Sequence, residues 1–453
     1  MATAGARQTK FGFIPSILLS VVLNPLNSAT ISVGLEVLLH ALHATAAGIT
    51  WIVSGYYLGS AVSQPIMGAL GDRMGYRRLV YLGFVLVLLT AVLAPLSHNL
   101  WVFVAWRGVQ AVGTSMVYPN AIGLVRRWEA RRVPVILGWI GMAAGIALAV
   151  GPALGGLLIA QFGWQAIFWL NIPIALGAGM MLWASVPRDD AHPRPRTPGW
   201  DWGGSILFAV TMLLLLIGTS GTAGQRALLW LFGGIGALLV LVGWERRQKA
   251  PVVPVRWFLT PAFAVLAVAT ILTNVVMYVA LYGIPVLLEA KRHLSVSGSG
   301  FMLLIFAGVM ALASPIGGRM ARGSARRWPY VGSAFLLVAA SLAMALSRAQ
   351  LWVIGAALAL MGLSFAVSNV VLQQLILELR PPEESGSASG LYSLMRYVGT
   401  MASSVIIALA FQGAHKLYIL YDGLVIASLL GFLAGWGLPR MRPADAASLS
   451  RQM

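Results

Sequence analysis

Long apolar runs recur along almost the whole of this sequence and restrict what the chain can form. Runs of about 18 residues or more, each long enough to cross a hydrocarbon core of roughly 30 Å as a helix, extend from residue 12 to residue 438 with only short connectors between them. Hydrophobic residues occupy 59% of the 453 positions, above the roughly 45–50% of soluble domains. The sequence therefore predicts an all-α integral membrane protein without a sizeable soluble domain.

The runs divide into fourteen predicted spans. They cover residues 12–35, 48–70, 79–97, 100–125, 133–160, 164–186, 203–221, 226–244, 262–288, 299–318, 328–347, 350–378, 389–412 and 417–438. Most of the 31 Lys and Arg residues fall in alternate connectors and near both ends of the chain. Because cytoplasmic connectors are enriched in Lys and Arg, we expect both termini to be cytoplasmic.

Charge and cysteine content exclude other classes of protein. The net charge of +18 comes from basic residues scattered in small clusters between apolar runs, which indicates membrane topology rather than a nucleic-acid-binding face. The chain has no cysteine, so a disulfide, a thiolate metal site and a cysteine nucleophile are all excluded. We expect no enzymatic activity, no catalytic residue, no cofactor and no metal.

An internal repeat organises the spans. The stretch PIMGALGDRMGYRR, which begins at Pro65, has a degenerate echo in PIGGRMARGSARR, which begins at Pro315. The two copies are too far apart for six spans alone, so we place a two-span insertion between two six-span halves, an arrangement typical of transporters. The predicted segments are an N-terminal bundle at 1–186, the inserted pair with its flanking loops at 187–256, a C-terminal bundle at 257–438 and a cytoplasmic tail at 439–453.

The first copy of the repeat carries the most specific motif. It has the form G-x-x-x-D-R-x-G-x-R-R, set by Gly68, Asp72, Arg73, Gly75, Arg77 and Arg78. Here the sequence resembles the major facilitator superfamily, whose signature after its second span has this spacing. An ordinary basic turn would explain the arginines and glycines but not an aspartate at a span end. A carboxylate there can cap the positive N-terminus of a helix, and the resemblance implies a conformational latch with residues 385–389, at the start of the thirteenth span, as its partner.

A second motif lies within the fourth predicted span. The stretch RGVQAVG is similar to the family's R-x-x-Q-G-x-G and supplies Arg107 and Gln110, with Ala111 in place of a glycine. An arginine inside a span costs about 2.5–3.5 kcal/mol on insertion scales, so it should face a partner or a wet cavity. Arg107 is therefore either a functional residue or a structural arginine bonded to carbonyl groups.

The fifth span and the inserted pair resemble one branch of the superfamily in particular. The stretch GWIGMAAGIALAVGPALGG looks like the antiporter motif G-x8-G-x3-G-P-x2-G-G, with Ala147 replacing one glycine and five matching residues: Gly138, Gly151, Pro152, Gly155 and Gly156. Small residues also allow close helix packing, which is part of the explanation. The inserted pair, followed by WERRQKAPVVPVRWF, resembles the fourteen-span drug:proton antiporters, a branch that usually has an aspartate where Asn27 stands here.

Polar faces on several spans predict a central substrate cavity with apolar and aromatic walls. Its candidate residues are Asn24, Asn27, Gln110, Thr114, Tyr118, Asn274, Tyr278, Tyr282, Asn369, Gln373 and Arg396. Each of these residues alone is more often a contact between helices than a ligand contact. None of the thirteen carboxylates lies at a predicted midplane. The coupling candidates are Arg107 and three carboxylates near span ends, with Glu36, expected near Arg107, ahead of Glu289 and Asp422.

These features predict a secondary active transporter that exports amphipathic or lipophilic compounds, as multidrug efflux proteins do, by alternating access with proton antiport. Two alternatives stay open: an exporter of a specific metabolite or lipid-like compound without proton coupling, and a membrane sensor that binds without transporting. We expect a monomer in the bacterial cytoplasmic (inner) membrane. Its expected partners are a small-molecule substrate, protons and membrane lipid, with no nucleic acid.

Overall fold

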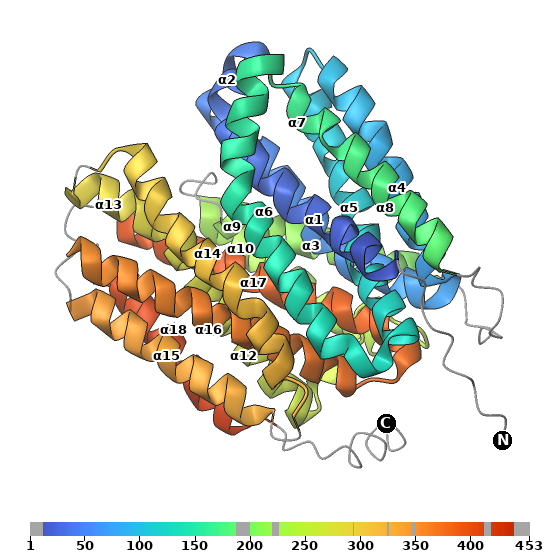
Figure 1. The fold of residues 1–453 in the computed structure, drawn as a ribbon. Helices are drawn as coiled ribbons and strands as arrows, with labels where there is room; N and C mark the ends of the chain where they lie inside the picture. Colours follow the sequence, from blue (N-terminus) through green and yellow to red (C-terminus); the bar gives the residue numbers. More distant parts are fainter. Residues whose placement is uncertain are drawn as a thin grey trace. The chain divides into compact units, whose positions relative to one another are not determined.

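A computed structural model describes residues 12–186, 200–219, 226–292, 294–323, 326–346, 350–411 and 418–438. Every regular element in these ranges is helical (Figure 1). The predicted tail at 439–453 and most of the connector before the inserted pair lie outside the described residues. The all-α class that the apolar runs predict is therefore confirmed for the part of the chain that the structure describes.

Long helices make up the N-terminal part of the chain. They are α1 (Phe13–Val33), α3 (Ala46–Met74), α4 (Tyr76–Leu93), α5 (Leu100–Trp128), α6 (Val133–Phe162) and α8 (Asn171–Ser185). Short elements connect them: α2 (Leu35–Ala41), η1 (Ala94–Leu96), η2 (Ala130–Arg132) and α7 (Ala166–Trp169).

The inserted pair and the C-terminal helices follow. The long helices are α9 (Trp202–Thr219), α10 (Ala227–Glu245), α12 (Pro261–Tyr278), α14 (Val296–Met320), α15 (Arg327–Leu346), α16 (Leu351–Glu378), α17 (Ser385–Phe411) and α18 (Tyr418–Trp436). The shorter elements are α11 (Val255–Phe258), the π-helical turn η4 (Val279–Gly283), α13 (Ile284–Arg292) and η5 (Pro382–Glu384). Because η4 joins α12 to α13, the predicted span 262–288 forms one continuous helical run with a π turn inside it.

Twelve helices or joined helical runs in the described ranges are long and apolar enough to cross a membrane. The two long helices outside this set are α3 and α5, each of 29 residues. Polar and charged side chains such as Asp72, Arg107 and Asn120 interrupt their apolar runs. Arg107 and Asn120 are at most 1% exposed, so the low hydropathy of α5 reflects side chains that face protein.

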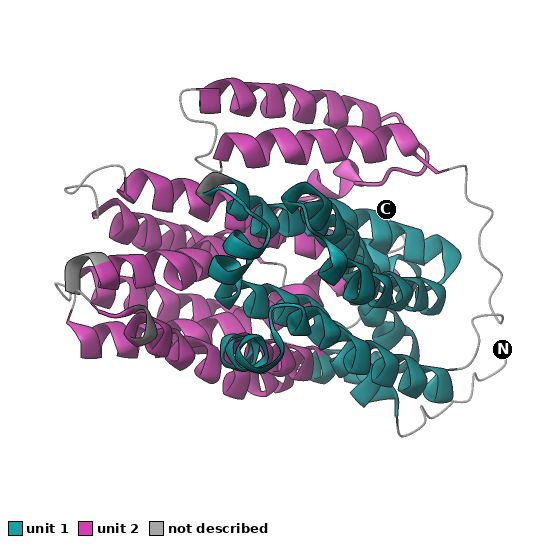
Figure 2. Cartoon of the chain, turned by 90° about the horizontal axis from the view of Figure 1, so that it is seen from above, with its two compact units in different colours: residues 1–136, 150–197, 382–390 teal, residues 137–149, 198–381, 391–453 magenta. Residues whose placement is uncertain are grey.

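Contacts divide the chain into two compact units (Figure 2). The first unit comprises Met1–Ile136, Val150–Thr197 and Pro382–Gly390, and the second comprises Leu137–Ala149, Pro198–Pro381 and Leu391–Met453. The first turns of α17 are therefore grouped with the N-terminal helices. The early-middle part of α6 is grouped with the C-terminal helices.

In the first unit, α5 packs along both α3 and α4, and α1 packs along α8. Near the start of α5, three aromatic rings form an edge-to-face cluster: Phe103, Trp164 and Phe168 have centroids 5.4–6.4 Å apart. Asn99 caps α5 by accepting a hydrogen bond from the Trp101 backbone N–H at 2.8 Å. Such caps satisfy the orphan N–H groups of a helix start.

In the second unit, α16 packs along α14 and α15, while α18 packs along α12 and α15. The inserted helices α9 and α10 pack on each other. The apolar window of α10 is only 11% buried, and Leu229 and Phe232 are about 70% exposed. In a membrane protein an apolar helix face of this kind is suited to lipid contact.

Candidate functional site

Asp72, near the end of α3, contacts the first turn of α17. Its Oδ1 accepts a hydrogen bond from the Gly386 backbone N–H, and its Oδ2 accepts one from the Ser387 backbone N–H, both at 2.8 Å. The Ser387 hydroxyl also donates to Oδ2. The carboxylate therefore occupies the helix N-terminus, where free N–H groups and the helix dipole favour negative charge.

Tyr76 strengthens this contact. Its hydroxyl donates to Asp72 Oδ1 at 2.8 Å and also lies 3.2 Å and 3.1 Å from the backbone carbonyl oxygens of Pro382 and Glu383. Arg126, near the end of α5, donates to the Ser385 hydroxyl at 3.2 Å. Three N-terminal segments thus hold the first turn of α17 within the first unit.

Two glycines allow α3 and α17 to approach closely at this point. A Cβ on Gly68 would lie 2.1 Å from the Gly386 carbonyl oxygen, and a Cβ on Gly386 would lie 2.3 Å from that of Gly68. Neither position has room for a larger residue, because backbone atoms cannot move aside as a flexible side chain can. The first glycine of the motif is therefore required by packing.

The remaining motif residues shape the turn that follows Asp72. Gly75 ends α3 with φ 101°, a backbone conformation that favours glycine. Arg77 is 8% exposed and lies over the Tyr81 ring, 5.5 Å from its centroid. Arg73 is partly buried, whereas Arg78 is exposed. The resemblance implies that Asp72 contacts residues 385–389, and the contact is present there; its action as a latch stays a prediction.

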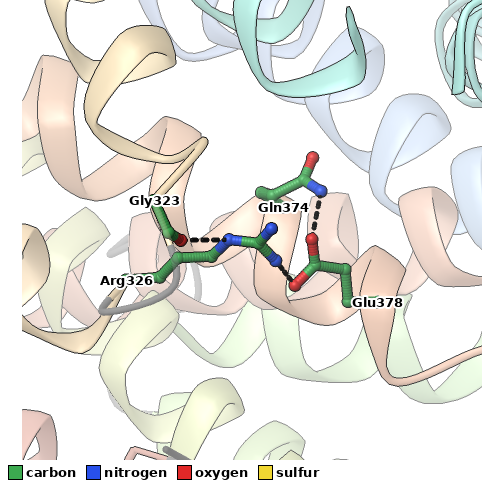
Figure 3. Close-up of polar contacts among 4 residues, drawn as sticks. All are labelled: Gly323, Arg326, Gln374 and Glu378. Carbon is green, nitrogen blue, oxygen red and sulfur yellow. Dashed lines mark hydrogen bonds and ion pairs between the residues drawn. The ribbon is translucent and has the colours of Figure 1, made fainter. Parts of the chain in front are cut away.

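The second copy of the repeat uses different chemistry. Counted from Pro315, the position of Asp72 is occupied by Arg322. Arg326 instead pairs with Glu378, the last residue of α16, and donates from Nε to the Gly323 carbonyl oxygen at 3.0 Å (Figure 3). Gln374 also donates to Glu378. The echo therefore ties its loop to α16 through an ion pair.

Amide side chains in the first unit form a buried network. Asn27 and Asn171 exchange two hydrogen bonds, at 2.7 Å and 3.0 Å. Gln110 donates to Asn27 Oδ1 at 3.1 Å and accepts a hydrogen bond from Arg107. Buried polar groups of this kind need partners, because an unpaired one costs about 1–3 kcal/mol. The network joins α1, α5 and α8.

Arg107 is 1% exposed, and its guanidinium lies over the Tyr56 ring, 4.2 Å from the centroid. Its Nε and Nη2 have no hydrogen-bond partner in the described part of the chain. The Tyr56 hydroxyl lies 3.1 Å from Thr114 Oγ1, to which Asn24 donates at 3.4 Å. Arg107 thus uses an aromatic face and an amide rather than the row of carbonyl groups that a purely structural arginine would use.

The predicted cavity residues of the second unit form smaller groups. Tyr278 and Tyr282 stack with centroids 5.7 Å apart, and Tyr282 is 43% exposed. Asn274 donates to the Thr270 carbonyl oxygen at 2.8 Å, and its Oδ1 is buried without a partner among the described residues. The other predicted residues are Asn369, which accepts from the Tyr392 hydroxyl, the buried Gln373, the partly buried Arg396 and, in the first unit, the partly buried Tyr118.

The three coupling carboxylates lie on α2, α13 and α18. Glu36 is exposed on the short helix α2, and no ion pair joins it to Arg107 in the described structure. The expectation that it lies near Arg107 gains no support, because α1 ends at Val33 and a separate helix carries Glu36. Glu289 accepts a hydrogen bond from Ser299 at 2.6 Å. Asp422 is exposed in the first turns of α18.

The glycine motif of α6 makes close contacts within each unit. A Cβ on Gly138 would lie 2.7 Å from the Ser314 carbonyl oxygen of α14, within the second unit. In the first unit, a Cβ on Gly151 would lie 2.5 Å from Ala29 Cβ, and one on Gly155 would lie 2.9 Å from the Thr30 carbonyl oxygen. Gly156 has only ordinary contact distances, and Pro152 lies within an unbroken helix.

Sequence reasoning missed several members of these contacts. Asn171 and Tyr56 sit in apolar runs where nothing nearby marks them, and Tyr76 lies inside the Asp72 motif at a position that the motif leaves open. Glu378 could have been predicted, because it is a carboxylate at the end of a predicted span and the second copy of the repeat supplies arginines for it to pair with. The other three are recognisable only through partners far away in the sequence.

A bundle of long apolar helices with a buried arginine, amide networks and a helix-capping aspartate is typical of membrane transporters. A profile of the Major Facilitator Superfamily matches residues 17–404. The chain belongs to this superfamily of transporters, whose members bind small-molecule substrates.

Individual relatives agree with this assignment. The MFS-type transporter YwoD of Bacillus subtilis is 32% identical over 417 residues, which cover 90% of this chain and 91% of that protein. The tetracenomycin C resistance and export protein of Streptomyces glaucescens is 26% identical over 466 residues, covering 98% and 82%. The crystal structure of the human organic anion transporter MFSD10 has a similar fold, with TM-score 0.66 and 15% identity over 94% of this chain and 99% of that one.

Proposed function

We propose that this protein exports amphipathic or lipophilic compounds from the bacterial cytoplasm by alternating access in exchange for protons. The contact between Asp72 and the first turn of α17 carries the proposal. It consists of hydrogen bonds between a charged acceptor and neutral donors, each worth about 1.5–3 kcal/mol. A contact of this size is strong enough to favour one conformation and weak enough to break during a transport cycle.

The proposed substrate class follows from the composition of the polar groups. The predicted cavity residues are amides, a threonine and tyrosines with one arginine, Arg396, and no carboxylate is among them. Sites with apolar walls and few fixed charges suit bulky lipophilic compounds. A relative named as a tetracenomycin C resistance and export protein supports export as the direction of transport.

We infer fourteen membrane spans, by adding α3 and α5 to the twelve apolar runs. At a rise of about 1.5 Å per residue, a helix of this length extends roughly 43 Å, which exceeds the hydrocarbon thickness. The two helices pack along each other in the first unit, and α5 also packs along α4. With the basic connectors on the inner side, both termini are cytoplasmic, and the chain is a monomer surrounded by inner-membrane lipid. The four predicted segments, with the inserted pair at 187–256, belong to this arrangement.

The coupling group is proposed among Arg107, Glu36, Glu289 and Asp422. Arg107 has the strongest structural support, because it is buried and two of its nitrogens lack partners among the described residues. A buried cation responds to the charge of its surroundings, which suits a residue that senses protonation or an anionic group.

A second function is favoured by one observation. Asn27 occupies the position where the resembling antiporters have an aspartate, and its amide is paired with Asn171. An amide does not titrate, so this site cannot carry a proton. The second candidate is therefore export of a specific metabolite or lipid-like compound without proton coupling. A sensor that binds ligands without cycling is the third.

Reconstitution into proteoliposomes separates the three candidates. A panel of labelled lipophilic compounds is tested first for counterflow, the exchange of outside label for unlabelled compound inside, and then for accumulation driven by a pH gradient. An antiporter passes both tests, and an uncoupled exporter passes only the first. Binding without any counterflow would contradict transport and favour the sensor.

A further inference from the structure

We propose that Asp201 and Glu245 form a proton-binding site at the adjoining ends of α9 and α10, in which Glu245 holds the proton and Asp201 is ionised. Both residues belong to the second unit. Neither residue is a member of the Asp72 contact or of the amide network, which belong to the first unit. The inference does not rest on the proposed transport function, because proton binding here is a property of the resting protein.

Burial distinguishes these two carboxylates. Asp201 is 8% exposed and Glu245 is 2% exposed, and no other Asp or Glu in the described ranges is buried to this degree. A buried carboxylate remains charged only when hydrogen bonds or a cation compensate for lost hydration. The partners of each oxygen therefore decide which of the two residues is ionised.

Asp201 has the donors that an ionised carboxylate needs. Its Oδ1 accepts from the Gly204 backbone N–H at 2.8 Å and from Trp244 Nε1–H at 3.1 Å, and its Oδ2 lies 3.3 Å from the same indole nitrogen. Asp201 immediately precedes α9, so it lies at the positive end of that helix. Gly204 and Trp244 both donate to this carboxyl group, so it needs no proton of its own to make these contacts.

Glu245 has the opposite surroundings. Its Oε1 accepts from the Val253 backbone N–H at 3.2 Å. Its Oε2 is buried and has no hydrogen-bond partner among the described residues. Glu245 is the last residue of α10, where the helix dipole disfavours negative charge. A proton on Glu245 removes the uncompensated charge from this position.

The two carboxyl groups are close neighbours. A Cβ on Gly204 would lie 2.3 Å from Asp201 Oδ2 and 2.9 Å from Glu245 Oε1. The two oxygens are therefore separated by at most the sum of these distances. Two carboxylates this close do not both ionise readily, because each charge disfavours the other.

Basic residues nearby do not form ion pairs with Glu245 in the described structure. The charged side chains on the segment after α10 are Arg246, Arg247, Lys249 and Arg256, and all four are exposed. The Arg256 guanidinium donates to the Arg246 carbonyl oxygen at 3.0 Å. The proton is thus the cation that compensates this acid pair. Its loss would place two negative charges where α9, α10 and the segment at Val253 meet.

Infrared difference spectroscopy of the purified full-length protein tests the site, because a protonated carboxylic acid has its own carbonyl stretching band. We expect the wild-type protein to show such a band at neutral pH and to lose it at alkaline pH. Glu245→Gln should remove that band. Glu129→Gln should keep it, because Glu129 forms an ion pair with Arg132 at 3.9 Å and belongs to the first unit. A titrating band of unchanged intensity in Glu245→Gln would overturn the proposal.

A second variant keeps the test decisive if Glu245→Gln does not fold. Asp201→Asn removes the neighbouring negative charge while keeping an acceptor for Gly204 and Trp244. The band should then persist, with its midpoint moved to lower pH. An unchanged midpoint, or a midpoint moved to higher pH, would contradict coupling between the two carboxyl groups. Neither measurement uses a transport substrate, so failure of the transport proposal would leave these results unaffected.

Discussion

Asp72 joins segments that are more than 300 residues apart in the sequence. Hydrogen bonds from Gly386, Ser387 and Tyr76 converge on its two oxygens. The contact depends on negative charge, because backbone N–H groups at a helix start attract an anion more strongly than a neutral acceptor. A substitution that keeps shape but removes charge therefore tests the proposed latch directly.

We expect Asp72→Asn to impair transport much more than folding. Loss of the charge-assisted hydrogen bonds, about 1.5–3 kcal/mol each, should shift the conformational equilibrium by roughly tenfold or more, since 1.4 kcal/mol corresponds to a factor of ten. Counterflow in proteoliposomes measures transport, and membrane yield measures folding. Glu129→Gln is the matched control, because it also neutralises a carboxylate at a helix end. Full transport by Asp72→Asn would show that the contact is not a latch.

Single residues also mark the limit of sequence reasoning at the candidate site. Asp72 is predictable, because a carboxylate at a span end stands out against a basic turn, whereas the region of its partner is implied only by the resemblance to the superfamily. Asn171 is not, because its role depends on Asn27 in another helix. Glu245 appears in the sequence as the first residue of a loop, and only the fold buries it beside Asp201. Polar contacts between distant helices have no local signature.

At the scale of elements, the glycine motif of α6 shows which of its positions helix packing restricts to glycine. A Cβ on Gly138, Gly151 or Gly155 would lie closer to another helix than an ordinary van der Waals contact, whereas one on Gly156 would be at an ordinary distance. The motif therefore contains both constrained and unconstrained glycines. The constraint comes from shape rather than from backbone conformation, because all four glycines lie inside a regular helix.

This difference provides a matched pair of variants. Gly151→Ala should destabilise the protein by about 1–3 kcal/mol, the usual cost of overpacking, because the added methyl group would lie 2.5 Å from Ala29 Cβ. Gly156→Ala should be neutral or stabilising by up to about 1 kcal/mol, since alanine is the better helix former. Thermal unfolding in detergent, followed by tryptophan fluorescence, measures both. Equal unfolding temperatures for the two variants would contradict the packing explanation.

Element boundaries follow the apolar runs well, and the exceptions have physical causes. The predicted span 48–70 is shorter than α3, because the helix continues through Asp72 to Met74 and stops at Gly75. The π turn η4 within the predicted span 262–288 has no sequence signal, because it depends on how the surrounding helices pack. Glu36 falls on α2 rather than on α1, because the chain starts a new helix after Gly34.

At the scale of the whole molecule, the span count decides where every loop lies. Fourteen spans require that α9 and α10 both cross the membrane and that α10 begins outside and ends inside. A helix of 19 residues extends about 28 Å at 1.5 Å per residue, close to the hydrocarbon thickness of roughly 30 Å. Arg226 immediately precedes α10, and Arg247 follows its last residue by two positions. Both arginines are exposed.

These two arginines allow the count to be tested in a chain that has no cysteine of its own. In intact cells, Arg226→Cys should react with a membrane-impermeant thiol reagent added outside, and Arg247→Cys should react only after the cells are permeabilised. His98→Cys, in the exposed connector before α5, is the control for an outer position. The opposite pattern at 226 and 247 would reverse the orientation. Reaction of both on one side would mean that α10 does not cross, because a spanning helix must separate its ends by the bilayer. The inserted pair would then lie along the membrane surface, and the fourteen-span arrangement would be wrong.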